Sequence, residues 1–181
     1  MTEQSSLLAT PLQPCYDTDF TNEPILITGC ARSGTSLTAG IISKCGAFGG
    51  TTLGPVGHNQ KGQFENRTIV NELIKPYLRS IGVDPLGQNP LPDYGDLVDF
   101  PHFSDEVLRV MFNHGYTGDR RWYYKCAKMC LMWPIWATAF PKTRWVIVRR
   151  DKENIVNSCL RTHFMRAFKN KVGWERWVEI H

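Results

Sequence analysis

One stretch near the N-terminus constrains the fold more than any other part of the chain. Residues 24–37 have the sequence PILITGCARSGTSL, in which a short apolar run leads into a Gly-x-x-x-x-Gly turn and then into a second apolar segment. This order predicts a strand at about residues 25–28, a tight loop, and a helix from about Ser33 to Lys44. Such a loop directs backbone N–H groups and a helix N-terminus toward one point, which favours binding of an anion. The simpler alternative is that the two glycines serve only the turn.

The loop differs in one position from that of nucleoside triphosphatases. Their pattern is G-x-x-x-x-G-K-[ST], in which the Lys after the second glycine binds the β- and γ-phosphates. Here Thr35 occupies that position, and the cation of the loop is Arg32. We therefore expect a loop that holds a phosphate-like group without a triphosphate.

Downstream, short apolar strands alternate with helical patterns, which predicts an α/β fold with a mostly parallel sheet. Residues 1–23 are polar and turn-rich and are expected to form an irregular leader. A single domain is expected over 24–181, and we expect it to be either truncated or a short version of its fold. Pro76 predicts a kink or an early end in the second helix. Further strands are predicted at 122–126 and 143–150, helices at 65–79, 104–115, 129–140, from 151 and from 174, and long loops at 46–62 and 84–101.

Composition limits the classes of function. With 42% hydrophobic and 21% charged residues, and no apolar run approaching the ~20 residues of a membrane-spanning helix, the chain is expected to be globular and without a membrane span. The net charge of +4 suits a small polyanion, whereas nucleic acid would require a clustered basic stripe. No nucleic-acid partner is therefore expected.

The cysteines favour a reduced, cytoplasmic protein. There are six, and none forms a C-x-x-C pair, so neither a zinc site nor a disulfide scaffold is indicated. The N-terminus also lacks the charged and apolar regions of a secretory signal. Cys30 lies in the glycine-containing loop, where its thiol could be accessible.

A second group of residues follows the predicted strand at 143–150. Arg150 stands at its carboxyl end, and Ser158 lies eight positions later, about two turns into the next helix. Because ligands of open α/β sheets bind beyond the carboxyl ends of the strands, both side chains could converge on the edge that carries the glycine-containing loop. Alternatively, Arg150 pairs with an acid of the helix, and Ser158 is an ordinary helix serine.

Together these two stretches resemble the sulfotransferases that use 3′-phosphoadenosine 5′-phosphosulfate (PAPS). Arg32-Ser33-Gly34-Thr35-Ser36 after a strand is similar to their 5′-phosphosulfate loop, and the spacing of Arg150 and Ser158 resembles their 3′-phosphate site. The resemblance covers roughly residues 24–166 and implies a P-loop-type three-layer sandwich, PAPS as co-substrate and no metal. The cofactor-binding residues that it implies are Gly29, Arg32, Ser33, Gly34, Thr35, Ser36, Arg150 and Ser158.

The resemblance also implies three catalytic residues. Arg32 would stabilise the transferred group, and Lys125 lies where the family has a Lys-Asp-Pro-Arg-type element, although Cys126-Ala127 replaces Asp-Pro here. Glu65 resembles the glutamate base of a Gly-x-x-Glu segment, but it could instead only complement a helix dipole. His58 and His102 are the alternative bases.

The expected reaction is transfer of a sulfuryl group from PAPS to a hydroxyl or amine of a small molecule, saccharide or peptide. A P-loop kinase with a degenerate loop is one alternative, and a non-catalytic nucleotide-binding module of the same fold is another. The sequence leaves the acceptor and the oligomeric state open, because the loops at 46–62 and 84–102 have no pattern that fixes their shape.

Overall fold

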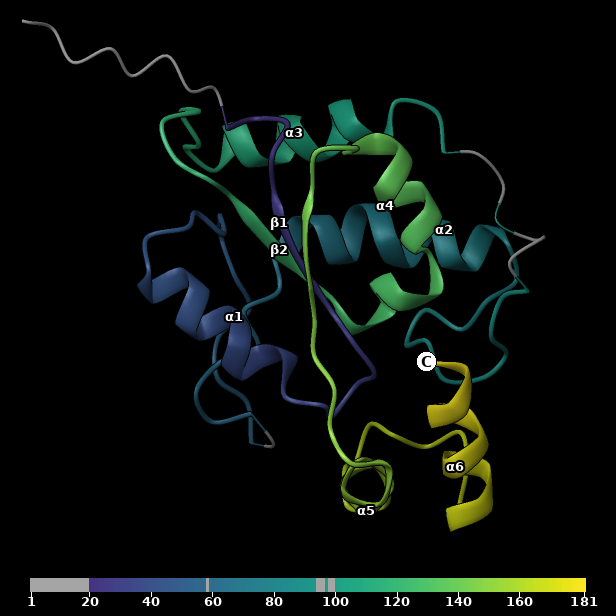
Figure 1. The fold of residues 1–181 in the computed structure, drawn as a ribbon. Helices are drawn as coiled ribbons and strands as arrows, with labels where there is room; N and C mark the ends of the chain where they lie inside the picture. The colour runs from purple at the N-terminus through teal and green to yellow at the C-terminus, as the bar shows by residue number, and fades with distance from the viewer. Residues whose placement is uncertain (1–19, 58, 94–96, 98–99) are drawn as a thin grey trace, which may run out of the picture.

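A small parallel sheet forms the centre of the molecule. The structure, a computed structural model, describes residues 20–57, 59–93, 97 and 100–181 (Figure 1). The strands are β1 (Ile25–Thr28), β2 (Tyr123–Lys125) and β3 (Arg144–Ile147), and they are ordered β2–β1–β3. β1 is the central strand, and its Leu26 pairs with Tyr124 of β2 and Trp145 of β3. The α/β fold with a parallel sheet predicted from the sequence is confirmed.

Helices cover both faces of this sheet (Figure 1). On one face, Ile27 and Tyr123 pack with Ala39 of α1 (Thr35–Lys44). On the other face, Leu26 and Tyr124 belong to a larger core that includes Met129 of the 3₁₀ helix η3 (Ala127–Leu131) and residues of four further helical segments. This division follows from the strands, whose successive side chains point to opposite faces. The four segments are η1 (Ile69–Ile74), α2 (Lys75–Ser80), α3 (Phe103–Asn113) and α4 (Trp133–Ala139).

A third apolar cluster joins the last two helices, α5 (Lys152–Leu160) and α6 (Lys171–Ile180), to the loop after β1. Asp151 caps α5, since its carboxylate accepts a hydrogen bond from the Asn154 N–H. Cys30 is buried in this cluster, so the expectation of an accessible loop thiol is wrong.

Two helix predictions are corrected by the structure. Of the two outcomes predicted at Pro76, a kink or an early end, the early end is wrong, because α2 continues to Ser80. A π-helical turn, η1, directly precedes α2, and the wider turn accommodates a proline that lacks an N–H. The helix predicted at 129–140 is divided into a 3₁₀ helix, η3 (Ala127–Leu131), and α4, which holds Pro134 in its first turn.

The boundaries of other elements shift by a few residues. β3 ends at Ile147, so the predicted strand at 143–150 is too long and Arg150 lies beyond it. The helix predicted from 174 begins at Lys171. Of the predicted leader, residues 20–23 contain no helix or strand, and Thr21 accepts a hydrogen bond from the Trp122 indole. Residues 1–19 lie outside the described part of the chain.

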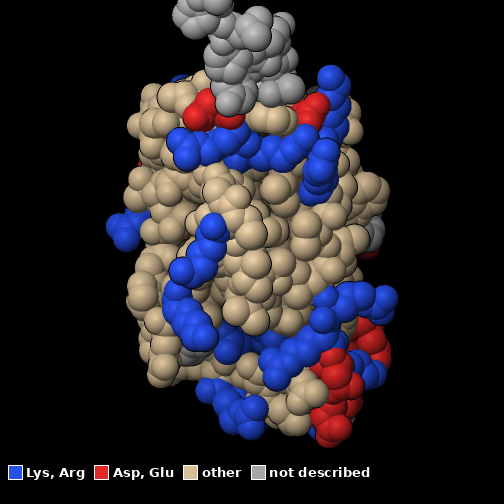
Figure 2. Space-filling view, turned by 60° about the vertical axis from the view of Figure 1, so that its left-hand side comes forward, with Lys and Arg blue, Asp and Glu red and all other residues tan. Residues whose placement is uncertain are grey.

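Charged side chains are unevenly spread on the face that Figure 2 brings forward. Lys and Arg side chains gather toward its two ends, and uncharged residues occupy most of the area between them. On this face the positive charge of the chain is therefore divided between separate groups.

Candidate functional site

The 29–36 loop makes a tight turn between β1 and α1 that depends on its glycines. Gly29 has a φ of 146°, and a Cβ added there would lie 2.2 Å from the Val148 carbonyl oxygen. Gly34, with a φ of 107°, precedes the first residue of α1. Arg32 also has a positive φ, 72°, which is uncommon for a residue with a side chain. Only glycine at position 29 therefore allows the loop to lie this close to the end of β3.

The N-terminus of α1 is open. No side chain of the described residues caps it, and the N–H groups of Thr35 and Ser36 donate to no described carbonyl. These N–H groups and the positive end of the helix dipole suit an anion. In the same loop, the Ser33 hydroxyl is buried and has no hydrogen-bond partner among the described residues.

The two stretches that the sequence analysis paired are in contact. Arg32 Nε donates a hydrogen bond to Ser158 Oγ at 3.0 Å, across 126 residues of sequence. Arg150 Nη1 donates to the Arg32 carbonyl oxygen at 3.2 Å. Arg150 pairs with no acid of the described residues, contrary to the alternative interpretation of that side chain. The glycine-containing loop, the end of β3 and α5 therefore meet at one place.

Electrostatically, this meeting point is positive. Burial lowers the pKa of Arg32 and the neighbouring Arg150 lowers it further, although Cys159 acts in the opposite direction. Two guanidinium groups close together without a carboxylate are unfavourable unless an anion joins them. This arrangement suits a phosphate or sulfate group.

Beside the loop lies a cavity of about 460 Å³. It is lined by seven of the ten predicted site residues, and the other three, Gly29, Ser33 and Ser158, lie outside its lining. Among the described residues, six charged side chains line it and only Glu65 of these is acidic, so this part of the lining is strongly positive. The predicted residues among its lining are Arg32, Gly34, Thr35, Ser36, Glu65, Lys125 and Arg150.

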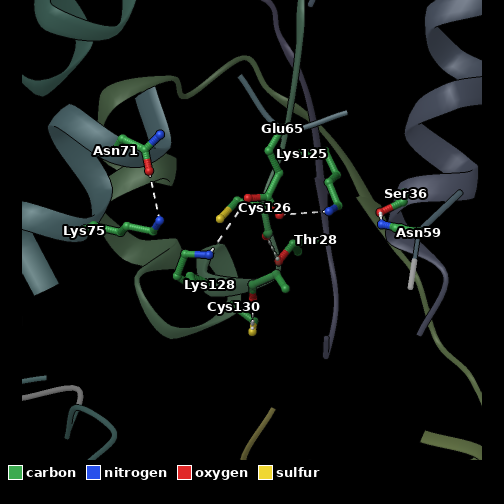
Figure 3. A network of polar contacts seen from close by, with 11 residues as sticks. Thr28, Ser36, Asn59, Glu65, Asn71, Lys75, Lys125, Cys126, Lys128 and Cys130 are labelled. Atoms are coloured by element: carbon green, nitrogen blue, oxygen red, sulfur yellow. Dashed lines mark hydrogen bonds and ion pairs between the residues drawn. The ribbon is translucent and has the colours of Figure 1, made fainter. Parts of the chain in front are cut away.

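Glu65 lies in a buried group of charges at the end of β2 (Figure 3). Its carboxylate is 2.9 Å from Lys125 Nζ and 3.9 Å from Lys128 Nζ. Burial alone would raise the pKa of Glu65, but the two lysines outweigh it and hold that pKa below its usual value. Because of these ion pairs, Glu65 does more than complement the dipole of the helical segment that follows it and leads into η1. In this arrangement the carboxylate is ionised and weakly basic.

Of the two histidines predicted as alternative bases, His102 does not line the cavity. His102 has a side chain that is 82% exposed and lies 3.5 Å from Asp105 at the start of α3. His58 lies outside the described residues.

The cavity is also lined by polar residues outside the predicted site, among them Asn59 and Lys75. Asn59 Nδ2 donates a hydrogen bond to Ser36 Oγ at 2.9 Å and so connects the 46–62 loop to α1. Lys75, the first residue of α2, lines the cavity together with Lys128. Neither had a signal in the sequence, because one lies in a loop without periodicity and the other resembles an ordinary surface lysine of a helix.

Within the described ranges, no three His, Cys, Asp or Glu side chains gather closely enough to hold a metal ion. Among the helices of those ranges, none has the length and apolar character needed to cross a membrane. Comparison of the chain with models of known protein families, with curated proteins and with solved structures finds no match.

Proposed function

We propose that this chain is a PAPS-dependent sulfotransferase of the P-loop α/β type. The contact between Arg32 and Ser158, supported by that between Arg150 and the Arg32 carbonyl, carries the proposal. It brings a loop that resembles a 5′-phosphosulfate site against a residue pair that resembles a 3′-phosphate site. A nucleotide with anionic groups at both positions would have partners at both.

Each part of the nucleotide has distinct partners in this proposal. The open N–H groups of Thr35 and Ser36, together with the Arg32 guanidinium, bind the 5′-phosphosulfate. Arg150 and Ser158 bind the 3′-phosphate, which requires Ser158 to exchange its hydrogen bond from Arg32 for one to the ligand. Arg32 is then free to turn toward the transferred group.

In the transfer step, the acceptor oxygen or nitrogen forms a bond to sulfur while the bond from sulfur to the 5′-phosphate oxygen breaks. That phosphate oxygen takes the electron pair, and the acceptor loses its proton to a base. Arg32, Lys125 and the loop N–H groups stabilise the negative charge that develops on the leaving oxygen and the sulfuryl group. The expected leaving product is adenosine 3′,5′-bisphosphate, and the proposal needs no metal ion.

Glu65 remains the predicted base, with a second role that its contacts support. Because it pairs with Lys125 at 2.9 Å, it also holds that ammonium group in the cavity. A base role requires Lys125 to move toward the sulfuryl group, which would raise the pKa of Glu65. In Glu65→Gln, loss of a base lowers kcat about 100-fold or more and removes the acid limb of the pH–rate profile. Loss of positioning alone lowers the rate but leaves the profile unchanged.

Calorimetric titration with adenosine 3′,5′-bisphosphate and, separately, with Mg-ATP tests the proposal. We expect the bisphosphate to bind more tightly, and Arg150→Ala to weaken it by about 1.5–3 kcal/mol, the value of hydrogen bonds to charged groups. Arg149→Ala is the matched control, since Arg149 is next to Arg150 in the sequence but does not line the cavity. Preference for Mg-ATP would favour a kinase and overturn the proposal. Binding of neither ligand would favour a module without this activity.

A further inference from the structure

The cavity holds more positive charge than the proposed nucleotide site uses. Five of the described side chains that line it are cationic, and three of these, Arg32, Lys125 and Arg150, belong to that site. The remaining two are Lys75 of α2 and Lys128 of η3. Figure 3 places Lys125 and Glu65 between Ser36 on one side and Lys128 and Lys75 on the other. The surplus lysines therefore lie on the side of the ion pair away from the N-terminus of α1.

Glu65 compensates this surplus only in part. It is closest to Lys125, and Lys128 is a further 1 Å away, with Nζ–carboxylate distances of 2.9 and 3.9 Å. Lys75 Nζ donates a hydrogen bond to the neutral Asn71 side chain at 2.8 Å and forms no ion pair with a described carboxylate. One carboxylate thus serves a group of three ammonium ions.

Lys75 and Lys128 also repel each other. Burial lowers the pKa of Lys75, and the charge of Lys128 lowers it further, while Glu65 opposes both effects. Ammonium groups in a partly dehydrated cavity are costly without a counter-charge. An anionic group between them would remove the repulsion and provide that counter-charge.

We propose that the acceptor carries a carboxylate or sulfate group that binds between Lys75 and Lys128 while its hydroxyl faces the donor near Lys125. The inference rests on the proposed function, because it assigns this end of the cavity to the acceptor. Apolar side chains that line the same cavity, Leu53 and Val70, would contact the uncharged part of that molecule.

The test measures acceptor binding to protein saturated with adenosine 3′,5′-bisphosphate. The probes are two matched pairs: 4-hydroxyphenylacetate with its methyl ester, and a uronic-acid disaccharide with its neutral counterpart. An acid whose uncharged part fits the cavity is expected to bind about tenfold more tightly than its neutral partner. This difference in affinity is what one hydrogen bond to a charged group provides. The pair that shows the preference distinguishes an aromatic from a saccharide acceptor.

Variants connect the preference to Lys75. Lys75→Gln should reduce the preference for the acid over its neutral partner to within about twofold. Lys75→Arg should keep this preference, since Arg keeps the positive charge. The control Lys142→Gln, which changes an exposed lysine outside the cavity, should also keep it. Affinity for the bisphosphate should be the same in all four proteins.

Several results would overturn the inference alone. For the unmodified protein, these results are acids that bind no better than their neutral partners, or no binding of either acid. For Lys75→Gln, they are a preference for the acid that persists, or a loss of bisphosphate affinity as large as the loss of acid affinity. Failure of the unmodified protein to bind the bisphosphate is a different result, since it overturns the proposed function and this inference with it.

Discussion

Replacing Glu65 with Gln tests the buried charge group without reference to any activity. The side chains of Glu65 and Lys125 are only 12% and 5% exposed, and their charged atoms are 2.9 Å apart. Removing one partner of a buried ion pair costs about 3–5 kcal/mol, because the other charge stays buried without compensation. Gln keeps a carbonyl oxygen that can accept a hydrogen bond from Lys125, so we expect Glu65→Gln to lower the free energy of unfolding by about 2–3 kcal/mol.

Urea unfolding at neutral pH measures this change as a lower midpoint at an unchanged slope. Glu179→Gln is the matched control, since its ion pair with Lys152 has a length of 3.0 Å but side chains that are 59% and 51% exposed. An exposed pair is screened by water and contributes little to stability, so the control should lose much less stability than Glu65→Gln.

A double-mutant cycle with Lys125→Met separates the pair from its surroundings. If the two side chains interact as the structure shows, the double variant should be less destabilised than the sum of the single variants, by about 1–3 kcal/mol. Equal losses in Glu65→Gln and Glu179→Gln, together with additive effects in the cycle, would refute the reasoning.

Three further predictions follow from the loop, the acidic group and the thiols. Gly29→Ala should lower the free energy of unfolding, measured by thermal unfolding, by about 3 kcal/mol or more, because the added Cβ would overlap a carbonyl oxygen. The control Gly57→Ala has open space around the added Cβ and should change stability by less than about 0.5 kcal/mol. The pKa of Glu65 is lower in the folded protein than in the unfolded chain. The stability that its carboxylate adds to the folded state is therefore fully present above the unfolded pKa of about 4.3 and is lost as the pH falls through the folded pKa. The acid-induced decline in the free energy of unfolding should therefore be shallower in Glu65→Gln. In a Cys15→Ser background, a thiol reagent should modify the exposed Cys45 first, because burial raises the pKa values of three of the other described thiols; an equal rate in Cys45→Ser would contradict this.

Local patterns were sufficient to predict most of the fold. The strand at 25–28 was predicted within its observed bounds, and the alternation of strands and helices gave the parallel sheet. Errors occurred where the chain compensates for a proline, as at Pro76, since a π turn has no recognisable signal in a single sequence. Strand ends were also misjudged, because pairing with β1 and not apolar content ends β3 at Ile147.

The sequence by itself determined the glycine-containing loop, the cation within it and the residue types that follow the last strand. These depend on neighbours in the chain, where turn geometry and side-chain periodicity are fixed locally. The tertiary structure decided which of them meet: the order β2–β1–β3 puts the ends of two distant strands on either side of the loop, so that Arg32 reaches Ser158 and Glu65 reaches Lys125. It also buried Glu65 between two lysines and left Lys75 without an ion pair to any carboxylate of the described residues. Burial and charge balance depend on contacts between segments that the sequence separates.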